Sequence, residues 1–238
     1  MAYLGFDRRV TLAWLDETAG IVIHTTDPVV VRAALHTQLA PAIAGVEARA
    51  KTITLLCRVW LNPPMAPHLR DAARGLLPVI APAERLWLHW GLTLLAFPFF
   101  RDVAATVGRL LHIQGNCTVG QVTDRMISVW GERSTLIRAT QRTLRSLVDW
   151  GVLAEHGDRG RFAAVARLRT TLPALHLWLL DASLRAHPNE GIALDVLTHL
   201  PELFPFDLVI ERRDLMQYGQ FEILAQGSGV DLVYPIMS

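Results

Sequence analysis

Lysine and cysteine are nearly absent from this 238-residue sequence. Lys51 is its one lysine, so its positive charge comes almost wholly from arginine. The two cysteines, Cys57 and Cys117, have no CxxC spacing and no clustered histidine partners. That pattern argues against a disulfide framework and against a closed zinc site. A reducing cytoplasm is therefore the compartment we expect.

The sequence also lacks an apolar run long enough to cross a bilayer. Its most apolar stretch, Leu86–Phe100, has fifteen residues without a formal charge, short of the roughly 20 that a membrane span needs. Because the stretch contains His89 and Pro98, we expect a buried core helix with His89 as a hydrogen-bonded core residue. Charges at positions 7–9 argue against a signal peptide.

Motifs of catalysis are missing as well. No GxSxG, HExxH or Walker A sequence occurs, and no nucleophile is paired with a base. The glycine-rich Gly227-Ser228-Gly229 lacks the strand-to-helix context of a phosphate loop. We therefore expect no enzyme activity, no cofactor and no bound metal.

Charge is present, but it is unevenly distributed. The whole chain has a net charge of +1. Residues 1–100 have nine basic and seven acidic residues, residues 101–169 eleven and six, and residues 170–238 three and nine. A basic middle next to an acidic end is typical of a module that meets polyanions beside one that does not.

Periodicity predicts a mostly α fold with small β elements. In the helical N-terminal region, residues 1–100, Asp27-Pro28 predicts a helix start with the carboxylate as N-cap. The expected helices there are Val29–Leu39, Ala48–Leu61, Pro67–Leu77 and Glu84–Ala96. No repeat of 20–50 residues is visible.

An acidic α+β region is expected over residues 171–238. Helices are predicted at Leu175–Arg185 and Ile192–Leu200, followed by strands at Phe206–Ile210, Phe221–Gln226 and Asp231–Tyr234. Gly227-Ser228-Gly229 predicts a hairpin turn between the last two strands. This acidic region could shield a DNA-binding face, contact other protein subunits or aid solubility.

The middle of the chain, residues 101–170, predicts three helices in succession. Asp102 can cap the first, which ends near Gln114-Gly115-Asn116. Thr118 and Gln121 have the spacing of a capping box at the start of the second helix, and Gly131 ends it. The third helix is expected from about Thr135 to Trp150, with Ser134 as its N-cap.

The third predicted helix has two chemically different faces. Leu136, Thr140, Leu144 and Leu147 share one side. On the opposite side a polar stripe combines three arginines with a glutamine: Arg138, Gln141, Arg142 and Arg145. After Gly151 a hairpin is expected, with strands at Val152–Glu155 and Arg161–Arg169 around a glycine turn that carries Arg159.

Residues 139–162, ATQRTLRSLVDWGVLAEHGDRGRF, resemble the winged helix-turn-helix superfamily. Members commonly have a recognition helix that ends in L-x-x-x-G-h-L ahead of a wing, and Leu147, Gly151 and Leu153 stand in those places. The resemblance covers about seventy residues and implies a fold and a binding mode, but no target. A fainter resemblance, based on the helical N-terminus and the G-h-L ending, is to BrxA-type accessory proteins of BREX phage-exclusion systems.

These features predict a protein that binds double-stranded DNA. Arginine can hold phosphate or the O6 and N7 atoms of guanine, and glutamine can bind the N6 and N7 atoms of adenine. Ser134 and Thr135, at a helix N-terminus, suit a phosphate oxygen. Arg159 and Arg161 lie where a wing meets the neighbouring backbone or minor groove.

The biological role stays open between a transcription regulator and an accessory factor of antiviral defence. An exposed arginine stripe can also be a solvated face whose arginines pair with nearby acids, and Asp149, on the same face, is placed to neutralise Arg145. Winged helices serve as protein–protein modules too, so a non-catalytic scaffold subunit is the alternative.

Overall fold

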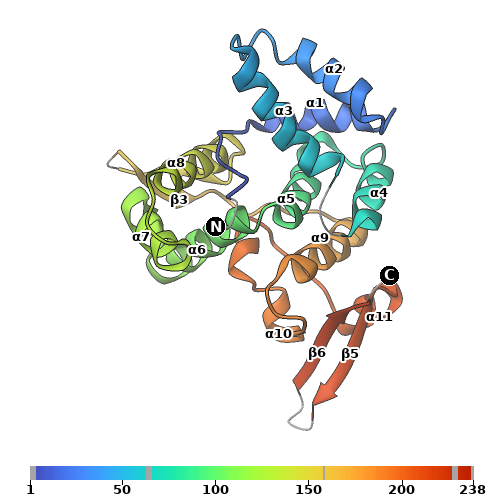
Figure 1. The fold of residues 1–238 in the computed structure, drawn as a ribbon. Helices are drawn as coiled ribbons and strands as arrows, with labels where there is room; N and C mark the ends of the chain where they lie inside the picture. The colour runs from blue at the N-terminus through green and yellow to red at the C-terminus, as the bar shows by residue number, and fades with distance from the viewer. Residues whose placement is uncertain (1–3, 63–65, 158, 227–229, 237–238) are drawn as a thin grey trace.

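The computed structural model describes residues 4–62, 66–157, 159–226 and 230–236 (Figure 1). Helices dominate these residues, and the strands form two small three-stranded sheets. The expected class, mostly α with small β elements, is confirmed.

Helices of the N-terminal region surround one end of the molecule (Figure 1). Asp27 caps the second of them as predicted, because its Oδ1 atom accepts hydrogen bonds from the backbone N–H groups of Val29 at 2.8 Å and Val30 at 3.4 Å. The first helix of this region, α1, was not among the predicted helices. The elements are α1 (Leu12–Val22), α2 (Pro28–Gln38), α3 (Val46–Trp60), α4 (Pro67–Leu76) and the 3-10 turn η1 (Pro82–Glu84).

Two apolar helices, α5 (Arg85–Ala96) and α9 (Pro173–Ala186), pack against each other at the centre. Every residue of α5 after the first is buried. A Cβ atom at Gly91 would lie 2.5 Å from the ring of Trp178, so glycine is what permits this close approach. None of the described helices combines the length and apolarity needed to cross a membrane.

The middle of the chain begins with a longer helix than expected, α6 (Pro98–Gln114). Pro98 starts this helix, so Asp102 is not its cap. The Asp102 carboxylate instead accepts a hydrogen bond from the indole Nε1 of Trp130 at 2.9 Å and pairs with Arg101 at 2.7 Å. Asp102 thereby connects α6 to Trp130, the last residue of the next helix along the chain.

After α6 the chain forms a helix pair framed by three short strands. These are β1 (Asn116–Thr118), α7 (Val119–Trp130), α8 (Ser134–Asp149), β2 (Leu153–Glu155) and β3 (Arg161–Ala164). The strand order is β1-β3-β2, and both pairings are antiparallel. Strand β1 falls where the sequence indicated only a turn, and β3 is shorter than the predicted strand.

The C-terminal region contains the second sheet, of order β4-β6-β5. Its elements are β4 (Ile192–Ala193), α10 (Leu194–Leu197), η2 (Pro201–Leu203), α11 (Arg212–Tyr218), β5 (Phe221–Gln226) and β6 (Val230–Pro235). The expected helix over Ile192–Leu200 is only partly present. The expected strand Phe206–Ile210 is wrong, because only Phe206 forms a bridge, to Leu168. The predicted turn at 227–229 lies outside the described residues.

One hydrophobic core connects all three predicted regions. The indole of Trp90, on α5, lies 5.9 Å from that of Trp150 and 5.8 Å from the ring of Phe204, centroid to centroid. Helix α6 also touches η2 so closely that a Cβ atom at Gly108 would lie 1.9 Å from the carbonyl oxygen of Pro201. The middle of the chain is therefore packed into the rest of the protein.

Candidate nucleic-acid interface

Helix α7 begins at the capping box that the sequence predicted. The Thr118 Oγ1 atom accepts a hydrogen bond from the backbone N–H of Gln121 at 3.2 Å, and the Gln121 Oε1 atom accepts one from the backbone N–H of Thr118 at 3.0 Å. Both orphan donors of the first turn are thus satisfied. Helix α7 packs against α8.

The two faces of α8 are divided as expected. Its buried residues are Leu136, Ala139, Thr140, Thr143, Leu144, Ser146 and Leu147. All six predicted site residues on this helix are exposed, namely Ser134, Thr135, Arg138, Gln141, Arg142 and Arg145. The predicted N-cap is wrong by one residue. Arg133 has the extended conformation of the cap, and Ser134 is already the first helical residue.

Four of the exposed residues form a continuous stripe along α8. At about 100° per residue, Ser134, Arg138, Gln141 and Arg145 fall within an arc of about 60°. Arg142 lies about 40° to the other side of Arg138, at the edge of the stripe. We call Ser134, Arg138, Gln141 and Arg145 the α8 stripe.

An extended N-terminal segment, residues 4–11, runs along the Arg142 edge of α8 before the chain enters α1 (Figure 1). The backbone N–H of Val10 donates to the Ser146 Oγ atom at 2.8 Å. The Trp150 indole Nε1 donates to the carbonyl oxygen of Val10 at 3.0 Å. These contacts, together with the fully buried ring of Phe6, hold the segment in place.

The N-terminal segment occupies two polar groups of α8 that the sequence placed on the exposed face. Arg142 donates from Nη1 to the carbonyl oxygen of Asp7 at 2.7 Å. Asp149 accepts from the backbone N–H of Leu12 at 2.9 Å and pairs with Arg9 at 2.8 Å. The suggestion that Asp149 neutralises Arg145 is therefore wrong, since its carboxylate is engaged with residues 9–12.

The arginines of the α8 stripe remain accessible. Arg145 makes a loose pair with Glu155 at 3.4 Å, in which both side chains are about half exposed. An exposed pair of this kind contributes at most about 1 kcal/mol and can be exchanged for another anion. Arg138 has no hydrogen bond or ion pair to any residue that the structure describes.

The hairpin predicted as a wing is short and bends back toward α7. Strands β2 and β3 pair Leu153 with Ala164 and Glu155 with Phe162, and the backbone N–H of Val119 donates to the carbonyl oxygen of Gly160 at 3.0 Å. Gly160, just before β3, is thereby hydrogen-bonded to the first residue of α7.

The two wing arginines have different surroundings. Arg159 is exposed at the tip. Arg161 is half-buried, and its Nη1 atom donates to the Asn116 side-chain oxygen at 3.0 Å. Arg159 is therefore the more exposed of the two.

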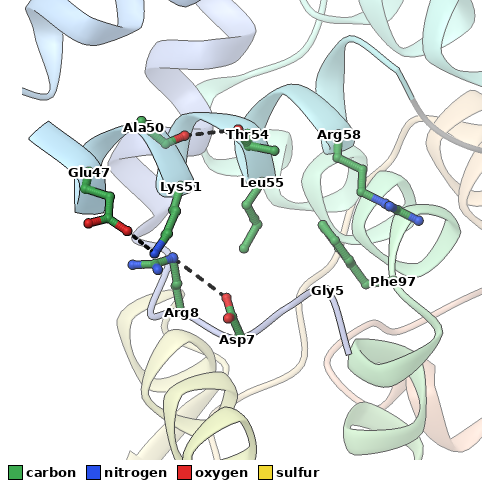
Figure 2. Close-up of a pocket in the computed structure, with 10 residues that line it drawn as sticks. All are labelled: Gly5, Asp7, Arg8, Glu47, Ala50, Lys51, Thr54, Leu55, Arg58 and Phe97. Carbon is green, nitrogen blue, oxygen red and sulfur yellow. Dashed lines mark hydrogen bonds and ion pairs between the residues drawn. The ribbon is translucent and has the colours of Figure 1, made fainter. Parts of the chain in front are cut away.

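A pocket of about 530 Å³ lies on the other side of the N-terminal segment, against α3 (Figure 2). Its cations have acids or backbone beside them: Lys51 pairs with Glu47, Arg8 lies 3.7 Å from Asp7, and Arg58 donates to the carbonyl oxygen of Ala96. Because its charges are largely compensated within the pocket, it does not extend the basic surface of α8.

Metal-ligating side chains are not clustered in the part of the chain that the structure describes. No group of three His, Cys, Asp or Glu residues with metal-binding geometry occurs among these residues. Burial raises the pKa of the Cys117 thiol to about 11, which keeps it protonated. His89 is fully buried and hydrogen-bonded to Trp60 and Asp16, as the sequence predicted for a core histidine.

The chain matches no protein-family model, and neither curated proteins nor solved structures include a significant match.

Proposed function

We propose that the protein binds double-stranded DNA through α8, in the manner of a winged helix-turn-helix. Support comes from the order of elements, in which two helices precede an arginine-lined helix and a hairpin follows it. This is the order that the sequence resemblance implies. The observation that carries the proposal is the α8 stripe, which stays exposed although α8 is otherwise packed on the core.

The α8 stripe has the chemistry that a major groove requires. A recognition helix inserts its N-terminal residues between the base edges while flanking groups hold phosphates. Arg138 and Gln141 lie in the first half of α8, where arginine can bind guanine and glutamine adenine. Ser134 and Thr135, in the first turn, suit a phosphate oxygen because backbone N–H groups converge there.

Two cations, one at the far end of the α8 stripe and one in the hairpin, suit the phosphate backbone. Arg145, about two turns beyond Arg138, can exchange its weak pair with Glu155 for a phosphate. Arg159 lies at the tip of the wing, where it can contact the phosphate backbone next to the groove that α8 enters. Contacts of this kind position a protein on the duplex without reading its sequence.

The proposal is tested by fluorescence anisotropy with a labelled duplex and the full-length protein. The variant Arg138→Ala/Arg145→Ala removes two exposed side chains and leaves the core face of α8 intact. We expect its affinity to fall at least tenfold. The matched control, Arg32→Ala/Arg213→Ala, removes the same charge from exposed arginines of α2 and α11 and should bind as the native protein does.

A scaffold role is the second candidate, and two contacts favour it. Arg142 and Arg161, both predicted to touch DNA, are used inside the protein. Val129 of α7 is 69% exposed and offers an apolar side chain to a protein partner. Folded native protein that does not bind duplex DNA at near-physiological salt would favour this role over DNA binding. Duplex binding suits both a transcription regulator and a defence accessory factor.

A further inference from the structure

A second pocket, away from the α8 stripe, lies between α6 and the chain around η2. It has a volume of about 310 Å³. One wall is the C-terminal half of α6, the second is the segment after β3 at Arg167, and the third is the stretch 198–206. The close contact of Gly108 with Pro201 holds the first and third walls together.

The polar groups that line this pocket are positive or neutral. Arg109, His112, Arg167 and His199 line it, and no carboxylate does. Arg109 and Arg167 are exposed and make no hydrogen bond or ion pair with the described part of the chain. The other arginine of α6 and the next arginine after Arg167 do form ion pairs, Arg101 with Asp102 and Arg169 with Asp207.

The nearest acid on the third wall points elsewhere. Glu202 follows Pro201 directly, but its side chain is buried and does not line the pocket. Burial raises the pKa of that carboxyl, although a backbone hydrogen bond and the charges of His187, Arg101 and Arg109 partly offset the effect. Glu202 therefore does not supply the two guanidinium groups with an ion-pair partner inside the pocket.

The inner surface of the pocket is apolar. Its lining includes Leu200, Pro201, Leu203, Phe204 and Phe206. Ile113, at the rim, is 74% exposed. A surface that combines an apolar floor with a few convergent polar groups is typical of a small-molecule site.

We infer that this pocket binds a small organic phosphate whose body contacts the apolar floor. Two guanidinium groups can hold a phosphate through parallel N–H···O bonds, and the two histidines can add further donors. The volume is at the lower end of the range for ligand pockets, about 300–1,000 Å³, which fits a single phosphate ester. This inference does not depend on DNA binding by α8.

Isothermal titration calorimetry on the full-length protein tests the inference with four probes. Phenyl phosphate and adenosine 5′-monophosphate each carry a phosphate on an apolar or aromatic body. Inorganic phosphate lacks the body, and adenosine lacks the charge. We expect one-to-one binding of at least one of the two esters, and at least tenfold weaker binding of inorganic phosphate and of adenosine.

The variant Arg109→Ala/Arg167→Ala should lose at least tenfold in affinity for the ester that binds. Two other changes serve as references: Arg125→Ala, which removes an exposed arginine of α7, and Arg138→Ala in the α8 stripe. Both should bind the ester as the native protein does, and thermal unfolding should confirm that all variants are folded.

Three results would overturn the inference. The first is no saturable binding of either ester. The second is equal affinity for an ester and for adenosine or inorganic phosphate. The third is an equal loss in Arg138→Ala, which would place the phosphate on α8 instead.

Discussion

The guanidinium of Arg142 is bonded to the backbone carbonyl of Asp7, with 2.7 Å between Nη1 and the oxygen. This contact joins α8 to a segment 135 residues earlier in the chain. Arg142 therefore differs from Arg138, although the two lie one turn apart on the same helix and both are exposed. The two arginines should therefore contribute differently to duplex binding.

Arg138→Ala should weaken duplex binding more than Arg142→Ala, because only Arg142 is already hydrogen-bonded within the protein. We expect a loss of at least tenfold for Arg138→Ala and of less than threefold for Arg142→Ala. Arg142→Ala should instead lower the free energy of unfolding by about 1 kcal/mol, the net contribution of a typical hydrogen bond. Anisotropy and urea unfolding on the same samples measure both effects, and a larger loss of DNA affinity in Arg142→Ala would contradict this division.

Arg159→Ala should reduce the affinity for random and for preferred duplexes by the same factor. The side chain lies at an exposed hairpin tip without a helical frame, so we expect it to contact phosphates, which carry no sequence information. Arg161→Ala should have a smaller effect on both, because Arg161 is engaged with Asn116. Competition titrations with a selected and a scrambled duplex measure this, and a loss confined to the selected duplex would show that the wing contacts bases.

Gly108→Ala should be strongly destabilising although alanine favours helices over glycine by about 1 kcal/mol. The new Cβ atom would overlap the backbone carbonyl of Pro201, and overpacking of a core typically costs about 1–3 kcal/mol or more. We expect a net loss of at least about 2 kcal/mol in urea unfolding. Gly20→Ala is the control, since nothing lies within 4 Å of a Cβ atom there. A Gly108→Ala protein as stable as Gly20→Ala would contradict the close packing of α6 on η2.

His89 should make stability depend on pH below about 6.5. Burial lowers the pKa of its imidazole, and the hydrogen bond to Asp16 only partly opposes this effect. In the unfolded chain a histidine has a pKa near 6.5, so the unfolded state binds more protons than the folded state as pH falls through that value. The histidine contribution to stability is therefore fully present above about pH 6.5 and is lost as pH falls.

Urea unfolding from pH 5 to pH 8 measures this dependence in the native protein and in His89→Gln. We expect the variant to be less stable at pH 8, because it loses the hydrogen bonds of His89 to Trp60 and Asp16. Its stability should also fall less steeply between pH 6.5 and pH 5. Equal slopes for the two proteins would show that another group sets the pH dependence.

Helix α8 could be predicted from sequence almost residue by residue. Its apolar positions recur with helical spacing, and the flanking Gly131 and Gly151 limit its length. The capping box of α7 was predictable for the same reason, because both partners lie within one turn. The start of α6 was missed because Pro98 was taken as the end of α5, whereas proline also suits the first residue of a new helix.

The N-terminal segment could not be placed from sequence, because its partners lie far along the chain. Ser146 and Asp149 accept hydrogen bonds from residues more than 130 positions earlier, and no local pattern encodes such a contact. One signal was present: Leu4, Phe6 and Val10 share a period of two, which is typical of extended chain with one buried side. That pattern would have indicated a strand-like segment, though not its position along α8.

The salt dependence of DNA binding tests the role of the α8 stripe most directly. Each phosphate contact releases counterions, so the slope of log affinity against log salt concentration becomes shallower by about 0.9 for every contact removed. Arg145 is expected on a phosphate, and Arg138 on a base edge or a phosphate. Arg138→Ala/Arg145→Ala should therefore bind more weakly, with a slope shallower by about one if only Arg145 meets a phosphate and by about two if both do. The control Arg32→Ala/Arg213→Ala should keep the native slope. Native affinity and an unchanged slope in the α8 double variant would contradict DNA binding through this helix.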